Sequence, residues 1–181
     1  MRLLALLVFA ATPVAAEEWF QHSSGELRAF HGDWTAVCED QGEGPCRVVG
    51  VAKDEGSSAF FDMRIAVHRI DNSPNWAVEV MDRNMPAAEL TELTLDVDGD
   101  AVVFAPSDLN QGDFEGYNAV DSTVIRSPEQ AADLVERMKA GNRVTMRYAP
   151  QGGGDGIASL SLRGITAALN AVEARVLARQ E

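Results

Sequence analysis

The sequence predicts an α+β fold that is mainly β: an antiparallel β-sandwich or barrel-like sheet, one mid-to-late helix and a C-terminal amphipathic helix. Three observations support this prediction. Apolar and polar residues alternate in several short runs, which is the period of a strand with one buried face. Turn-forming residues separate those runs, and helical spacing begins only after about residue 127. Strands first and helices late favour α+β over an alternating α/β fold.

The first sixteen residues have the pattern of a secretory signal peptide. Arg2 supplies a positive start, residues 3–11 form an apolar run, and residues 14–16 are small. The apolar run has about half of the roughly 20 residues that a membrane span needs, and no later segment is long enough. We therefore expect cleavage near Ala16, a periplasmic or secreted location, no transmembrane segment in the mature chain, and a single exported β-rich domain over residues 17–181.

The acidity of the chain bears on its partners. The formal net charge is −13, and loss of Arg2 with the signal peptide takes it to −14. Such a balance repels phosphate backbones and anionic lipid surfaces, so nucleic acid is not an expected partner. The expected partner is an unknown protein or envelope component, and the simplest role of the acidity is to keep an exported protein soluble.

The two cysteines lie in neighbouring apolar runs. Residues 33–38 and 46–51 flank a polar loop that contains glycine and proline, a pattern typical of a hairpin. In an oxidising compartment these cysteines should form a Cys38–Cys46 disulfide, worth roughly 2.5 kcal/mol on the chain-entropy model. A redox pair needs Cys-x-x-Cys spacing and a metal site needs more ligands, so neither is expected.

Alternation continues through the middle of the chain. Residues 17–31 have little periodicity and should form an arm that leads to the first strand. Residues 60–70 are the clearest strand, with one face apolar and the other polar and solvated. Residues 76–80 repeat the pattern and should pair with it as the core hairpin. The inward residues expected in the first of these strands are Phe61, Met63, Ile65 and Val67.

An Asp-Gly pair at residues 98–99 lies between the alternating runs 93–97 and 101–104. This is a strong hairpin signal, because glycine tolerates the positive φ that a tight turn requires. The acidic run 96–100 resembles part of a calcium loop, but Ala101 stands where that loop needs glycine. The hairpin interpretation accounts for every residue, and we expect no metal and no cofactor.

Residues 105–121 are rich in glycine, asparagine, aspartate and proline, and they predict a long surface loop. Such loops often carry recognition. Phe114 and Tyr117 are therefore the candidate partner-binding residues. The alternative is that these aromatic rings pack back on the domain.

Helix signals follow this loop. Ser127 can cap a helix, Pro128 suits its first position, and Gln130 stands where a capping box has its second member. Gly141 should end that helix. Two more strands are expected at 143–149 and 157–162, joined by a turn at 151–156, before a closing helix from about residue 165 to residue 179. The expected buried residues of the two helices are Ala131, Leu134, Val135, Met138, Ile165, Leu169, Val172 and Val176.

No catalytic motif is assembled in the sequence. There is no Gly-x-Ser-x-Gly elbow, and the imidazole bases are His22, His31 and His68, which are far apart in the chain. We therefore name no catalytic residue. The alternative is an exported hydrolase whose site is built from scattered residues such as His68.

Three segments resemble those of a known family. Residues 32–38 read Gly-Asp-Trp-Thr-Ala-Val-Cys, residues 46–47 read Cys-Arg, and residues 159–169 read Ser-Leu-Ser-Leu-Arg-Gly-Ile-Thr-Ala-Ala-Leu. The chain is similar in these segments to the invasion-associated locus B family of exported bacterial proteins, and to related periplasmic proteins of unknown function. It departs from that family in lacking a second cysteine pair and in carrying Ile165 where an aromatic residue is frequent.

The resemblance implies an exported protein linked to host-cell invasion, and it implies no catalytic residue. Together with the signal peptide and the alternating strands, it leads to the expectation of a non-enzymatic, envelope-associated binding protein.

Overall fold

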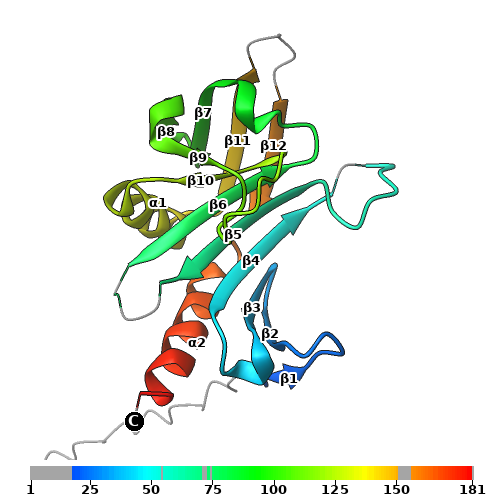
Figure 1. The fold of residues 1–181 in the computed structure, drawn as a ribbon, viewed down its shortest axis with the longest axis vertical. Coiled ribbons are helices and arrows are strands. Elements are labelled where there is room, and N and C mark those ends of the chain that lie inside the picture. Colours follow the sequence, from blue (N-terminus) through cyan, green and yellow to red (C-terminus); the bar gives the residue numbers. More distant parts are fainter. Residues whose placement is uncertain (1–17, 54, 71–72, 74, 151–155, 181) are drawn as a thin grey trace, which may run out of the picture.

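A computed structural model describes residues 18–53, 55–70, 73, 75–150 and 156–180 of the chain (Figure 1). The strands form two antiparallel sheets, one of eight strands and one of four. The predicted signal peptide and most of the predicted turn at 151–156 lie outside the described residues. The described part therefore has the predicted class, a mainly β fold with two α-helices, and its sheets do not close into a barrel.

The large sheet contains the first half of the chain and a short return. Its order is β1 (Phe20–Gln21), β2 (Leu27–His31), β3 (Trp34–Cys38), β4 (Cys46–Ala52), β5 (Met63–Arg69), β6 (Trp76–Asp82), β10 (Ser122–Ile125) and β9 (Leu109–Gln111). The small sheet has the order β12 (Gly156–Ser161), β11 (Arg143–Pro150), β7 (Leu90–Val97) and β8 (Asp100–Phe104). Short 3₁₀ turns lie at Asp40–Gly42, Ala87–Glu89 and Pro106–Asp108.

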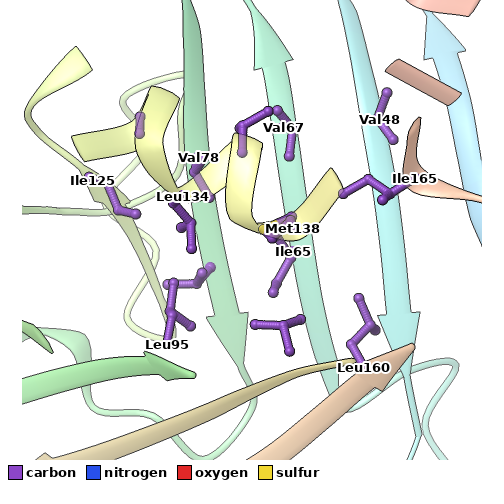
Figure 2. Close-up of a cluster of buried hydrophobic side chains, with 14 of the residues drawn as sticks. Val48, Ile65, Val67, Val78, Leu95, Ile125, Leu134, Met138, Leu160 and Ile165 are labelled. Atoms are coloured by element: carbon purple, nitrogen blue, oxygen red, sulfur yellow. The ribbon is translucent and has the colours of Figure 1, made fainter. Parts of the chain in front are cut away.

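One face of the large sheet is covered and the other is open. Helix α2 (Ile165–Ala178) packs on β2, β3 and β4, and helix α1 (Pro128–Ala140) packs on β6 and β10. Strand β12 of the small sheet contacts β4 (Figure 1). The apolar core lies between these elements and the covered face, where burying apolar surface supplies the main driving force for folding. Figure 2 shows its centre, with residues from both sheets and both helices: Val48, Ile65, Val67, Val78, Leu95, Ile125, Leu134, Met138, Leu160 and Ile165.

Most predicted elements are present with the predicted inward faces. The β5–β6 hairpin places Ile65 opposite Val80. All eight residues expected to be buried in the two helices are buried. The β7–β8 turn has positive φ at Asp98 (52°) and Gly99 (98°), as the Asp-Gly signal predicts. Ser127 caps α1 by accepting a hydrogen bond from the amide of Gln130, at 3.2 Å.

Several expectations are wrong in detail. The predicted arm at 17–31 contains the strands β1 and β2. These strands are too short to show a clear alternation, and they form by pairing, β1 with β2 and β2 with β3. The long loop at 105–121 contains β9, and β10 was not expected at all. The second hydrogen bond of a capping box, in which the Gln130 side chain would accept from the Ser127 amide, is missing. Oε1 of Gln130 is buried and has no partner among the described residues. Phe61 precedes β5 and faces the open side of the large sheet.

Segments far apart in the chain meet at the β2–β3 turn. The indole Nε1 of Trp34, which is fully buried, donates to the carbonyl of Ser161 at 2.8 Å. The amide of Asp33 donates to the carbonyl of Arg163 at 2.9 Å, and the Arg163 guanidinium pairs with the Asp33 carboxylate at 2.7 Å. The turn before α2 is thus hydrogen-bonded to the turn before β3.

Glycine is required where these turns touch. Gly164 has φ of 98°, and a Cβ there would collide with the carbonyl oxygen of His31. A Cβ at Gly32, with φ of 61°, would lie 2.6 Å from the carbonyl oxygen of Arg163. The two backbones therefore approach more closely than side chains permit.

We expect Gly164→Ala to lower the free energy of unfolding by about 3 kcal/mol, since it adds a backbone collision to the cost of positive φ. Gly116→Ala is the matched control, because Gly116 has φ of 85° but open space around its Cβ position. Its loss should be about 1 kcal/mol. Urea denaturation followed by circular dichroism measures both, and equal losses would show that the close approach does not matter.

Candidate functional site

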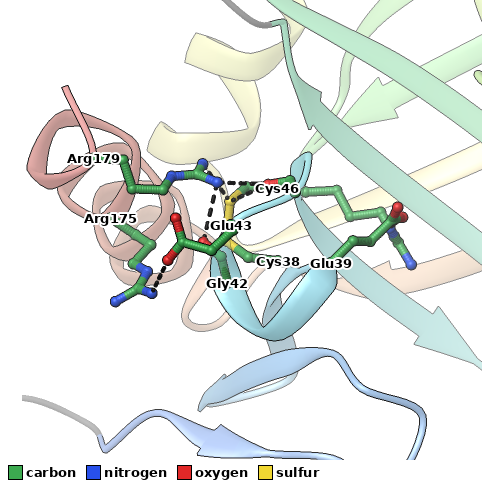
Figure 3. The surroundings of a disulfide bond; sticks show 9 residues. Cys38, Glu39, Gly42, Glu43, Cys46, Arg175 and Arg179 are labelled. Atoms are coloured by element: carbon green, nitrogen blue, oxygen red, sulfur yellow. Dashed lines mark hydrogen bonds and ion pairs between the residues drawn. A yellow bond between two sulfur atoms is a disulfide. The ribbon is translucent and has the colours of Figure 1, made fainter.

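The predicted disulfide is present. Cys38 and Cys46 are paired opposite each other in β3 and β4, and both are buried. Figure 3 shows that the C-terminal end of α2 lies against the hairpin loop. The Arg179 guanidinium donates to the carbonyls of Gly42 and Gly44, at 3.1 and 2.7 Å, and approaches the Cys46 sulfur at 3.2 Å. The disulfide is buried beneath these contacts, as is typical of a structural disulfide.

The two candidate partner-binding residues have different surroundings. The ring of Phe114 stacks on the imidazole of His68, with centroids 4.2 Å apart, and is 37% exposed. Tyr117 is 68% exposed. Its backbone is held by Asp113, which accepts a hydrogen bond from the Tyr117 amide at 2.9 Å. Phe114 thus packs back on the domain in part, while Tyr117 faces solvent, and a role for either in binding stays a prediction.

A buried ionic cluster lies behind Phe114. Glu79 of β6 has a side chain only 3% exposed, and it is ion-paired with Arg64 of β5. His68 Nε2 lies 3.0 Å from one carboxylate oxygen of Glu79, and the hydroxyl of Ser122 lies 2.8 Å from the other. The expectation that this face of β5 is simply solvated is therefore wrong. Arg64 and His68 on this face both pair with Glu79 of β6.

The cluster shifts the titration of Glu79. Burial by itself raises the pKa of a carboxyl group. Here the hydrogen bond from His68 and the positive charge of Arg64 outweigh burial and lower the pKa of Glu79 to about 2. The hydroxyl of Ser122 acts in the same direction. Glu79 is therefore charged at any physiological pH.

The order of the groups in this cluster differs from that of a serine hydrolase. A catalytic triad places the imidazole between the hydroxyl and the carboxylate, so that the hydroxyl proton passes to nitrogen. Here the carboxylate of Glu79 lies between Ser122 and His68, and Ser122 is 1% exposed. His31 lies on the covered side of β2, and His22 lies in the β1–β2 turn. The three histidines are not brought together.

The open face of the large sheet is hollowed into a cavity of about 470 Å³, here termed the trough. Its floor is one register row across four strands, in which Phe30, Thr35, Val49 and Ala66 lie side by side. The trough also contains Val37, Val51, Phe60 and Phe61. A volume in the range of 300–1,000 Å³ is typical of binding sites. Both the ionic cluster and the Asp113–Glu115 segment border it.

The arginines of the trough are paired with carboxylates. Glu26 accepts from Nε of Arg28 and from Nη2 of Arg47, each at 2.9 Å. Arg47 also pairs with Glu39. With the Arg64–Glu79 pair, all three guanidinium groups in the trough have an acidic partner.

The trough was not predicted from the sequence. The available signal was β4, which is apolar on both faces: Val48 points into the core, while Val49 and Val51 point to the open side. A strand with one solvated face normally carries polar residues on that face, so apolar residues on both faces of β4 indicate a further apolar surface. The 44% exposure of Val51 shows that no described part of the chain covers this face completely.

The acidic run at 96–100 is used by the turns around it. The Asp98 carboxylate accepts from the amides of Asn142 and Arg143, at 2.7 and 3.1 Å, which lowers its pKa. Asp96 accepts from the amide of Gly99 at 2.7 Å. No cluster of three or more potential metal ligands occurs within the described ranges.

Neither α1 nor α2, the α-helices that the structure describes, has the length and apolar character needed to cross a membrane.

Replacement of both cysteines, Cys38→Ala with Cys46→Ala, should lower the free energy of unfolding by about 2.5 kcal/mol, since the hairpin loop loses its covalent closure. Chemical denaturation with and without dithiothreitol measures the effect. Reductant should destabilise the wild type by a similar amount and leave the double variant unchanged. A wild type insensitive to reductant after unfolding would contradict this account.

Stability should fall in acid through Glu79. Its pKa is about 4.5 when unfolded and about 2 when folded, so its contribution is complete above pH 4.5 and is lost as the pH falls towards 2. The full effect is roughly 3 kcal/mol. In Glu79→Gln this part of the acid-dependent loss should be absent, with lower stability at neutral pH. Urea unfolding across the acid range measures it.

Glu115→Gln is the matched control for that series, because it makes the same charge change at an exposed residue of the trough border. It should keep the wild-type slope of stability against pH. Parallel slopes for Glu79→Gln and the wild type would remove Glu79 as the cause.

Comparison with known proteins agrees with the fold. No family model and no curated protein matches the chain. Among solved structures, the chain is similar to the crystal structure of invasion associated protein b from Bartonella henselae, with a TM-score of 0.60 and 15% sequence identity. The match covers 85% of this chain and 99% of that one.

The sequence resemblance is thereby confirmed at the level of the fold. Its two longer segments, 32–38 and 159–169, include the residues that bond to each other around Trp34 and Arg163. The chain has the fold of an invasion-associated locus B protein.

Proposed function

We propose that this chain is an exported, non-enzymatic binding protein, and that it contacts its partner through the trough. The observation that carries the proposal is the trough itself, a hollowed sheet face bordered by large exposed apolar side chains. Phe30 is 57% exposed, Val51 44% and Phe60 91%. Contiguous exposed apolar surface on a folded domain is characteristic of interaction sites.

Export is part of this proposal. The signal-peptide pattern of residues 1–16, the buried disulfide and the fold shared with an invasion associated protein all fit an extracytoplasmic location. That neighbour is named for an association with invasion, and we propose a comparable envelope role for this chain.

Binding without turnover is also part of it. The ionic cluster at the trough has its carboxylate between hydroxyl and imidazole, so Ser122 is not placed to pass its proton to His68. The competing possibility, an exported hydrolase, requires turnover of a defined substrate that is lost in His68→Ala. That result would overturn the non-enzymatic part of the proposal.

Photo-crosslinking from inside the trough tests the binding surface. A benzophenone amino acid at position 60 of the exported protein should give a discrete crosslinked product in living cells. The same probe at position 103, which is 54% exposed on the small sheet, should not. Adding Val49→Asp to the position-60 protein should remove the product, since it places a charge on the apolar floor.

Identical products from both positions, or none from position 60, would contradict a partner site in the trough. Circular dichroism of the Val49→Asp protein verifies that it is folded, so that loss of crosslinking reports on the surface.

A further inference from the structure

We propose that the occupant of the trough is an extended, basic segment of a partner polypeptide with apolar residues at alternate positions. The inference rests on the proposed function, because it names the chemistry of the partner at that same surface. Apolar side chains of the segment would lie against Val49 and Val51, whose side chains are accessible in the trough. Its lysines or arginines would lie beside Asp113 and Glu115.

The dimensions of the trough suit an extended chain. Lining residues come from β2, β3, β4, β5 and β6, so the trough crosses five adjacent strands. Strands in a sheet are about 4.8 Å apart, which makes the crossing about 19 Å long. An extended chain rises about 3.3 Å per residue, so about six residues span it, and every second side chain faces the floor.

The floor selects apolar side chains. Thr35, Val49 and Ala66 lie side by side in one register row and are small or medium in size. They leave space between the bulkier Phe30, at the β2 end of that row, and Phe60. Val49 is partly exposed and Val51 is 44% exposed, so an apolar occupant would remove their surface from water with a gain in free energy.

The charges select a basic occupant. The lining has three arginines and five carboxylates, and each arginine already has an acidic partner. The carboxylates of Asp113 and Glu115 form no ion pair with any described residue. The formal net charge of −13 attracts cations over a longer range and repels anions. A lipid acyl chain with an anionic head group would match the apolar floor, but the carboxylates of the trough would repel its negative charge.

The test titrates the full disulfide-bonded protein with three capped peptides of about eight residues, in which valine alternates with lysine, with serine or with glutamate. Isothermal titration calorimetry should show the lysine peptide binding at least about tenfold more tightly than the glutamate peptide. Raising the salt from about 50 mM to about 300 mM should weaken the lysine peptide severalfold, because exposed charges are screened.

Two double variants locate the effect. Asp113→Asn with Glu115→Gln should weaken the lysine peptide about fivefold and leave the serine peptide unchanged, since the pair acts by charge. The asparagine keeps an oxygen that can accept from the Tyr117 amide. Glu89→Gln with Glu92→Gln is the matched control, an equal charge change at exposed residues outside the trough, and should have little effect.

Each other outcome overturns the inference. Equal binding of the three peptides removes the charge selection, and tighter binding of the glutamate peptide or of phosphatidylglycerol vesicles reverses it. Binding that survives Val49→Asp places the peptide elsewhere, and no binding by any peptide rejects a segment of this kind. Crosslinking from position 60 decides separately whether the trough is a binding surface at all.

Discussion

The fold depends on the hydrogen bonds that join the start of the large sheet to the segment before the last helix. The fully buried Trp34 donates its indole proton to a carbonyl 127 residues later in the chain. Around this bond two glycine turns approach so closely that their backbones touch. Because this junction positions α2 on β2–β4, it decides which face of the large sheet is covered and which stays open.

The open face is stabilised by charge as well as by pairing of strands. A lone buried carboxylate would be costly, but Glu79 has three partners, Arg64 and His68 on β5 and Ser122 on β10. The cluster closes one end of the trough, and Phe114 is stacked upon it. Stability and the shape of the proposed binding surface are therefore coupled through the same few side chains.

Local sequence patterns predicted the parts of the fold that depend on neighbours in the chain. The Ser127 cap, the Asp98–Gly99 turn, the Cys38–Cys46 hairpin and the helix stripes each occupy a few consecutive residues. The failures depend on distant partners. Strands β2 and β10 are too short to show a period, and they become strands through pairing with β3 and β6.

The trough was not predicted for the same reason, because its lining comes from five strands. Arg64 lies opposite Met81 and Glu79 lies opposite Ala66, so their ion pair is diagonal and depends on a strand register that the alternation alone does not specify. The resemblance motifs, in contrast, were visible in sequence, but only the structure shows that they contact each other.

The contact between Arg179 and the disulfide loop has a consequence for the order of assembly. The two cysteines are separated by only eight positions, so their hairpin can oxidise before more distant parts of the chain have folded. Arg179, which covers the loop, lies 133 residues after Cys46 in the chain. Covalent closure can therefore precede docking of α2, and a variant without the Arg179 side chain would keep an oxidised hairpin whose carbonyls at Gly42 and Gly44 lack their guanidinium donor.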